Sequence, residues 1–85
     1  MTYAIEFRPA ALRDLKTLPV DLRKRIGRKI DSLADNPRPP GVEKLSGRED
    51  SYRVRVGDYR IIYEIRDQVL LIIIVEVGHR REVYR

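Results

Sequence analysis

The fold of this chain is most clearly encoded in the segment Ser51-Tyr52-Arg53-Val54-Arg55-Val56-Gly57-Asp58-Tyr59-Arg60-Ile61-Ile62-Tyr63. Residue types alternate up to Gly57-Asp58, and the residues that follow are mostly β-branched or aromatic. This pattern predicts two antiparallel strands joined by a two-residue turn. In the register that such a turn sets, Val56 lies opposite Tyr59, and Arg55 lies opposite Arg60.

The two faces of this predicted hairpin differ in chemistry. One face is apolar or aromatic and carries Tyr52, Val54, Val56, Tyr59, Ile61, Tyr63 and Ile65, whereas the other carries Arg53, Arg55 and Arg60. Like charges directly opposite each other destabilise a sheet, so the pairing of Arg55 with Arg60 indicates an anionic ligand. A phosphate is the natural candidate because guanidinium groups bind it bidentately. The alternative is a solvated strand face with salt bridges to Glu64 or to a bound protein.

The residues before the hairpin predict a strand, two helices and a loop. Residues 3–7 alternate as a strand does, Pro9 opens a helix that Pro19 closes, and a second helix ends at Asp35-Asn36-Pro37. The buried stripes of the two helices are predicted to be Ala11, Leu12, Leu15 and Leu18, and then Leu22, Ile26, Ile30 and Leu33. Residues 36–50 are rich in Pro, Gly and charge and are predicted to form a connecting loop.

The residues after the hairpin predict one more strand and complete the fold class. Asp67-Gln68 is predicted as a turn, and Val69–Val77 as a buried strand that Gly78 ends. The predicted order is therefore an N-terminal strand, a two-helix hairpin and a three-strand antiparallel meander. With both helices packed on one face of the sheet, this is an α+β fold, and the 85 residues predict a single domain over residues 1–85.

Composition narrows the classes of function. The net charge of +5 favours polyanionic partners. The chain has no cysteine and a single histidine, His79, which excludes disulfides and thiolate metal sites and disfavours a histidine-based metal site. No signal peptide and no bilayer-spanning segment are visible, so a cytoplasmic protein without membrane partners is expected.

The last strand is predicted to deliver a basic and aromatic cluster to one end of the sheet. This cluster comprises His79, Arg80, Arg81 and Tyr84. Recognition of single-stranded RNA uses such residues, because cations hold the phosphate backbone and an aromatic ring stacks on a base.

Three motifs together resemble the RelE toxins of the RelE/ParE superfamily. They are Lys44-Leu45-Ser46-Gly47, the hairpin from Tyr52 to Tyr63, and Val77-Gly78-His79-Arg80-Arg81-Glu82-Val83-Tyr84. The resemblance covers nearly the whole chain and implies the RelE-like microbial RNase fold. It also implies an mRNA interferase, an endoribonuclease that cuts mRNA in the A site of the 70S ribosome by attack of a ribose 2′-hydroxyl on the adjacent phosphodiester. No metal or cofactor is implied, and a cognate antitoxin would neutralise the toxin in a hetero-oligomeric complex.

The resemblance also implies roles for individual residues. Arg53 and Arg55 stand where the family often has two lysines, and Arg60 stands at its phosphate-binding arginine. Arg80 matches an arginine proposed as general acid, and Tyr84 matches a tyrosine that stacks on or orients the substrate base.

One departure from the family leaves the proton acceptor open. A lysine with a lowered pKa can act as a general base, but arginine stays protonated in proteins. Arg53 and Arg55 are therefore interpreted as electrostatic clamps. His79 is a candidate for acid–base work because histidine titrates near neutral pH, and Glu82 is a further candidate.

The second predicted helix has a basic side that would suit a ribosome-binding protein. Its residues Arg23, Lys24, Arg28 and Lys29, together with Arg81, are candidates for contacts with rRNA phosphates. The ordinary alternative is a solvated surface.

Two other functions share the predicted fold. A ParE-like toxin would inhibit DNA gyrase and cut no RNA, and a purely regulatory protein would bind only its antitoxin and operator DNA. The set Arg53, Arg55, Arg60, Arg80 and Tyr84 favours the nuclease, because a gyrase inhibitor has no evident use for it.

Overall fold

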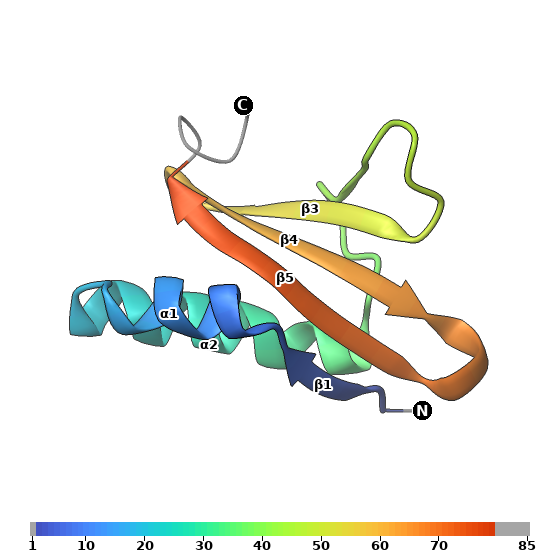
Figure 1. Cartoon of the computed structure of the whole chain (residues 1–85), viewed down its shortest axis with the longest axis horizontal. Coiled ribbons are helices and arrows are strands. Elements are labelled where there is room, and N and C mark those ends of the chain that lie inside the picture. The colour runs from blue at the N-terminus through green and yellow to red at the C-terminus, as the bar shows by residue number, and fades with distance from the viewer. Residues whose placement is uncertain (1, 80–85) are drawn as a thin grey trace.

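The computed structural model of the protein describes residues 2–79. Its elements are β1 (Ala4–Phe7), α1 (Pro9–Lys16), α2 (Val20–Asp35), β2 (Glu43–Lys44), β3 (Ser51–Val56), β4 (Tyr59–Arg66), the 3₁₀ helix η1 (Asp67–Val69) and β5 (Leu71–His79). The strands form one sheet in the order β1-β5-β4-β3-β2, and both helices lie on the same side of it (Figure 1). The predicted α+β fold is confirmed.

The β3–β4 hairpin has the register expected from its turn. Val56 pairs with Tyr59, and Arg55 pairs with Arg60. Gly57 has a φ of +59°, which a type II′ turn requires at its first loop position and which glycine adopts without steric cost. The antiparallel meander continues from β4 to β5, and β1 adds to it as a parallel strand beside β5.

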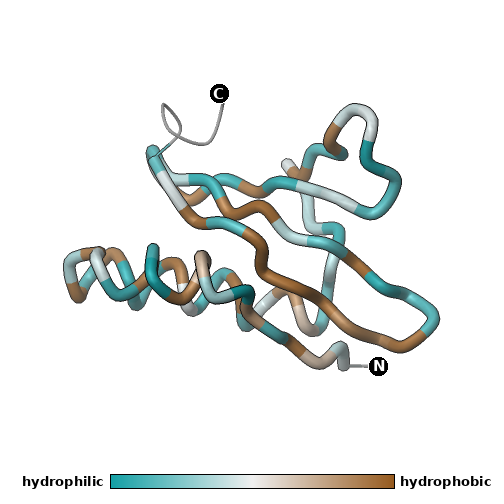
Figure 2. Tube along the Cα trace, in the orientation of Figure 1, coloured by the Kyte–Doolittle hydropathy of each residue, from teal (hydrophilic) through white to brown (hydrophobic). Residues whose placement is uncertain are grey.

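The core lies between the helices and the apolar face of the sheet. On α2 the buried stripe is Ile26, Ile30 and Leu33, as the helical spacing predicts. The strand residues that pack with it include Val54, Ile61, Tyr63, Ile65, Ile72, Ile74 and Val77. The longest hydrophobic run of the chain follows β5 (Figure 2), consistent with a strand that has neighbours on both edges, β1 and β4.

Two boundary predictions and one core prediction are wrong. Leu12 is 42% exposed, because α1 packs through Ala11, Leu15 and the following Leu18, and a residue one position on is rotated about 100° away from that stripe. Val69 belongs to η1, not to the last strand, and β5 continues through Gly78 to His79.

The loop predicted over residues 36–50 contains a short strand, β2. Glu43 pairs with Arg53, and Lys44 pairs with Tyr52. These two pairs attach the loop to the outer edge of β3, which places a carboxylate opposite one of the predicted arginines. Within residues 2–79, no helix has the length and apolar character needed to cross a bilayer.

Candidate active site

The three arginines of the hairpin line one cavity of about 290 Å³, here called the arginine pocket. Its lining residues come from α2, the loop after it and three strands, and are Lys29, Pro40, Gly41, Glu43, Arg53, Val54, Arg55 and Arg60. The structure therefore brings together Arg53, Arg55 and Arg60 as predicted, and adds a lysine from the helical layer.

Arg60 is the most enclosed of the three arginines. It is only 7% exposed, whereas the side chain of Arg53 is 22% exposed and Arg55 is exposed. Arg60 lies opposite Arg55 on one side and opposite Gly78, which has no side chain, on the other. The arginine face is thus enclosed at Arg60 and open at Arg55. Burying a cation next to another cation is unfavourable unless an anion compensates.

Glu43 supplies one anion to this pocket. Its Oε2 accepts a hydrogen bond from Nη2 of Arg53 at 2.7 Å. This hydrogen bond and the charge of Arg53, with smaller contributions from Arg60 and Arg55, hold the pKa of the Glu43 carboxyl below its usual range. Sequence reasoning missed Glu43 because its place beside Arg53 depends on β2, and a two-residue strand leaves no periodic signal.

Glu64, which was the sequence-based alternative partner for the arginines, has other cations beside it. Its Oε1 accepts a hydrogen bond from Nη2 of Arg66 at 2.7 Å, and Arg8 lies 4.0 Å away. Glu64 is on the same face of the sheet as Arg60 but farther along β4. Its carboxylate therefore pairs with Arg66 and Arg8.

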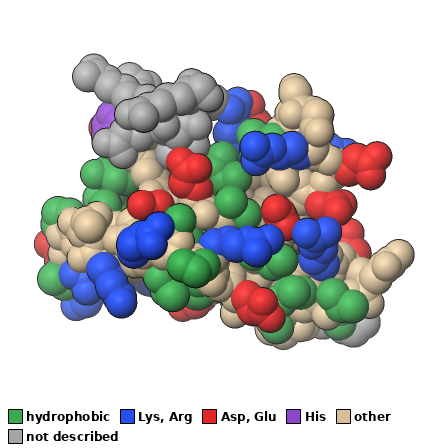
Figure 3. All heavy atoms as spheres, viewed as in Figure 1, with side chains coloured by type: hydrophobic (Ala, Val, Ile, Leu, Met, Phe, Trp, Pro, Cys, Tyr) green, Lys and Arg blue, Asp and Glu red, His purple; other side chains and the backbone are tan. Residues whose placement is uncertain are grey.

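Part of the basic side of α2 borders the arginine pocket. Lys29 lines it, and a neighbouring hollow is lined by Arg25, Arg28 and Lys29 together with Arg55, Val56, Gly57 and Ser32. Arg23 donates a hydrogen bond to the carbonyl of Leu18 at 3.3 Å, and neither Arg23 nor Lys24 lines these two cavities. In one view of the molecule, basic and acidic side chains are interspersed over the helical layer (Figure 3).

His79 lies on the other side of the sheet from the arginines. It pairs with Tyr59, and the two rings meet edge to face with centroids 5.5 Å apart. Tyr59 pairs with Val56, on the face that packs against the helices, and directly paired strand residues share a face. The structure therefore does not bring His79 together with Arg60. Arg80, Arg81, Glu82 and Tyr84 lie outside the described residues.

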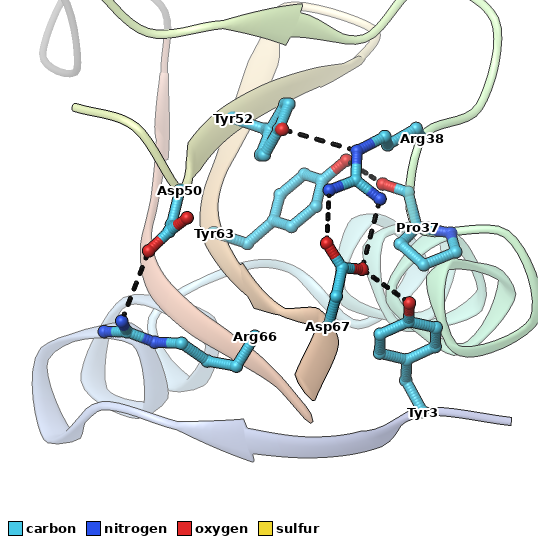
Figure 4. Close-up of polar contacts among 8 residues, drawn as sticks. All are labelled: Tyr3, Pro37, Arg38, Asp50, Tyr52, Tyr63, Arg66 and Asp67. Atoms are coloured by element: carbon cyan, nitrogen blue, oxygen red, sulfur yellow. Dashed lines mark hydrogen bonds and ion pairs between the residues drawn. The ribbon is translucent and has the colours of Figure 1, made fainter. Parts of the chain in front are cut away.

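A second polar group, here called the tyrosine cluster, lies at the opposite end of the β3–β4 hairpin and comprises Tyr3, Arg38, Tyr52, Tyr63 and Asp67 (Figure 4). Arg38 donates to both carboxylate oxygens of Asp67, at 3.3 and 2.8 Å, and to the hydroxyl of Tyr52 at 3.3 Å. The hydroxyl of Tyr3 donates to Asp67 at 2.6 Å. The hydrogen bonds from Arg38 and then Tyr3 lower the pKa of the Asp67 carboxyl.

The tyrosine cluster fastens the loop after α2 to the sheet. The buried hydroxyl of Tyr63 donates to the carbonyl of Pro37 at 2.7 Å, and burial raises the pKa of Tyr63. With Arg38 held by Asp67, two consecutive residues of the loop are fixed a few positions before Glu43. The cluster thereby supports the segment that carries Glu43 to the arginine pocket.

Residues 2–79 hold no group of three or more His, Cys, Asp or Glu side chains placed to bind a metal ion. The described residues that line the arginine pocket present guanidinium, ammonium and carboxylate groups. These groups can bind a phosphate, stabilise negative charge that develops on it, and accept a proton.

Comparison with known proteins identifies the family. Residues 5–84 match the family model described as ParE toxin of type II toxin-antitoxin system, parDE. The chain is 34% identical to Toxin RelE3 of Methanocaldococcus jannaschii over 92% of this chain and 91% of that protein. It is 28% identical to the mRNA interferase toxin RelE of Escherichia coli K12 over 99% and 92% of the two chains.

A solved structure agrees with these relatives in fold. The toxin in the archaeal RelE-RelB complex from Pyrococcus horikoshii superposes with a TM-score of 0.83 at 33% identity, covering 94% of this chain and 97% of that chain. The resemblance drawn from the three sequence motifs is thus confirmed. The chain belongs to the RelE/ParE superfamily of toxins of type II toxin–antitoxin systems.

Proposed function

We propose that this toxin is an mRNA interferase that cleaves mRNA in the A site of the ribosome. The observation that carries the proposal is the arginine pocket, in which Arg53, Arg55, Arg60 and Lys29 surround one cavity. Such a concentration of cations suits the binding of a phosphodiester better than the binding of another protein's surface. The name of the E. coli relative, mRNA interferase toxin RelE, supports the same activity.

The proposed reaction is transesterification within one nucleotide. The 2′-oxygen attacks the adjacent phosphorus, the bond between them forms, and the bond from phosphorus to the 5′-oxygen breaks. The products are a 2′,3′-cyclic phosphate and a 5′-hydroxyl. The guanidinium groups of Arg53, Arg55 and Arg60 would hold the phosphoryl oxygens and stabilise their growing negative charge. This stabilisation is strongest in a partly enclosed site such as that of Arg60.

The remaining roles follow from the family resemblance. Arg80 would protonate the leaving 5′-oxygen, and Tyr84 would stack on the base next to the scissile bond. We propose that no metal ion takes part, because the arginines supply the positive charge. A phosphorothioate at the scissile position should then slow cleavage without rescue by a thiophilic cation, whereas such rescue would contradict metal independence.

The proposed partners are the 70S ribosome with mRNA in its A site and a cognate antitoxin. The RelE-RelB complex from P. horikoshii supports a hetero-oligomeric toxin–antitoxin complex. An acidic segment of the antitoxin would neutralise the arginine pocket, and Arg28 and Lys29 beside it would contact rRNA phosphates. With these partners, we propose that the toxin acts in the cytoplasm.

The second candidate function is inhibition of DNA gyrase, and the match to the ParE family model favours it. Primer extension on a defined mRNA in programmed ribosomes, run in parallel with a gyrase supercoiling assay, separates the two. New mRNA ends in the A-site codon and unaffected supercoiling would support the interferase. Inhibited supercoiling without new ends would overturn it in favour of a gyrase inhibitor.

A further inference from the structure

The proposed reaction needs a proton acceptor that the arginines cannot provide. The attacking 2′-hydroxyl must lose its proton. Guanidinium groups cannot accept it, because they have donors but no acceptor. Lysine is ordinarily a cation at neutral pH, and His79 lies across the sheet against Tyr59. Among the described residues that line the arginine pocket, Glu43 is the only carboxylate.

The position of Glu43 suits a group that works beside a bound phosphate. Strand β2 pairs Glu43 directly with Arg53, so the two side chains share one face of the sheet. One carboxylate oxygen, Oε2, accepts the hydrogen bond from Arg53. In the described part of the chain, the second oxygen, Oε1, has no hydrogen-bond donor, and the side chain is 56% exposed. A substrate hydroxyl can therefore reach Oε1 while Arg53 holds Oε2.

We propose that Glu43 is the general base that takes the proton of the attacking 2′-hydroxyl, with Arg53 orienting its carboxylate. This inference rests on the proposed mRNA interferase activity. The proton moves from the 2′-oxygen to Oε1 as the bond from that oxygen to phosphorus forms. As the bond from phosphorus to the 5′-oxygen breaks, the 5′-oxygen takes a proton from the general acid, and Glu43 returns its proton to water.

The electrostatics of the pocket agree with this role. The arginines lower the pKa of Glu43, so the carboxylate is ionised throughout the neutral range and ready to accept a proton. A base of low pKa contributes modestly, and general-base catalysis typically supplies a factor of about 100 to 10,000. The same geometry allows a competing role, in which Glu43 occupies Arg53 and must leave before a phosphate binds.

Glu43→Gln distinguishes these roles, with Glu49→Gln as a matched control because Glu49 is an exposed carboxylate in the neighbouring loop. Single-turnover cleavage on programmed ribosomes and ribosome affinity are measured for both variants and the wild type. We expect Glu43→Gln to lower the cleavage rate about 100-fold with unchanged or tighter ribosome binding. Glu49→Gln should behave as the wild type.

The pH profile and chemical rescue test the proton transfer itself. The ordinary pKa of glutamate is about 4.3, so the Glu43 carboxylate is ionised between pH 6 and pH 8. In this range the wild-type rate should not require added base. In Glu43→Ala the rate should rise about tenfold per pH unit, because hydroxide must remove the proton. Added formate should restore part of the rate in Glu43→Ala and leave the wild type unaffected.

Four outcomes would overturn the inference. Wild-type or faster cleavage by Glu43→Gln with tighter binding would make Glu43 a competing anion. A loss of rate with an unchanged pH profile and no formate rescue would make it a positioning residue. A lowered unfolding temperature that accounts for the loss would make its role structural. Absence of cleavage by the wild type would instead remove the interferase activity, and the inference with it.

Discussion

The arginine pocket and the tyrosine cluster each contain an arginine–carboxylate pair of similar length, 2.7 Å for Arg53–Glu43 and 2.8 Å for Arg38–Asp67. Their surroundings differ. In the tyrosine cluster one cation meets one anion, and neutral hydroxyl groups complete the hydrogen bonding. Among residues 2–79, the arginine pocket places one carboxylate among four cations, Lys29, Arg53, Arg55 and Arg60. The charge around an ion pair, more than the pair itself, separates a structural contact from a binding site.

This difference has an energetic consequence. Arg55 and Arg60 lie directly opposite each other, and like charges in that position repel each other. A bound phosphate would offset this repulsion. The tyrosine cluster, which is balanced in charge, contributes its stability without a ligand. Substitutions should therefore affect activity in one region and stability in the other.

The largest expected effect comes from Arg60→Met, which keeps the length of the buried stem but removes the charge. Cleavage on the ribosome should fall about 100- to 1,000-fold, as when a preorganised stabilising group is lost. Thermal unfolding of the variant, measured beside the wild type, shows whether the loss of cleavage occurs in a folded protein. Arg13→Met, an exposed change on α1, should leave cleavage unchanged. A strongly destabilised Arg60→Met with wild-type cleavage would break the comparison.

A smaller effect is expected from Arg55→Gln, because Arg55 is exposed and its charge is better screened. Single-turnover cleavage should fall about tenfold. Denaturant unfolding should show a gain of about 0.5 kcal/mol, since the like-charge pair with Arg60 is removed. Stability that fell instead would mean that Arg55 has a structural role.

Tyr63→Phe tests the tyrosine cluster. The substitution removes the buried hydroxyl that donates to the Pro37 carbonyl, and the free energy of unfolding should fall by about 1 kcal/mol. Cleavage should change little while the protein stays folded. Tyr59→Phe is a suitable control because Tyr59 is only partly buried. Equal losses of stability in both variants would argue against the Pro37 hydrogen bond.

The smallest expected effect comes from Asp67→Asn, because both partners of this ion pair are well exposed. The pKa of Asp67 is depressed in the folded protein, so its contribution to stability is present above the unfolded value of about 4 and is lost as pH falls through the folded value. Thermal unfolding should show a gap of a few degrees between wild type and Asp67→Asn at pH 7 that closes in acid. Asp31→Asn, an exposed change on α2, serves as the matched control, and a gap that widened in acid would contradict the assignment.

The sequence predicted what depends on local periodicity. The Gly57-Asp58 turn set the pairing of Arg55 with Arg60, and helical spacing identified Ile26 and Ile30 on α2. It could not predict Glu43 beside Arg53 or Arg38 beside Asp67, because these pairs join segments 10 and 29 residues apart through irregular loops.

The face of the sheet on which His79 lies also could not be predicted from the sequence. It depends on the register between β4 and β5, which the irregular turn at Asp67–Val69 and a shift between Ile62 and Tyr63 determine. A one-residue change of register moves a side chain to the opposite face. Alternation within one strand therefore cannot assign the face of a residue relative to the next strand.

The most direct test is a structure of the toxin on a ribosome whose A-site mRNA carries a 2′-O-methyl group at the cleavage position, which blocks attack. The scissile phosphate should lie in the arginine pocket within hydrogen-bond distance of Arg60, with Glu43 facing the 2′-oxygen. A phosphate bound elsewhere, with the arginine pocket turned away from the mRNA, would contradict the assignment of this pocket as the active site.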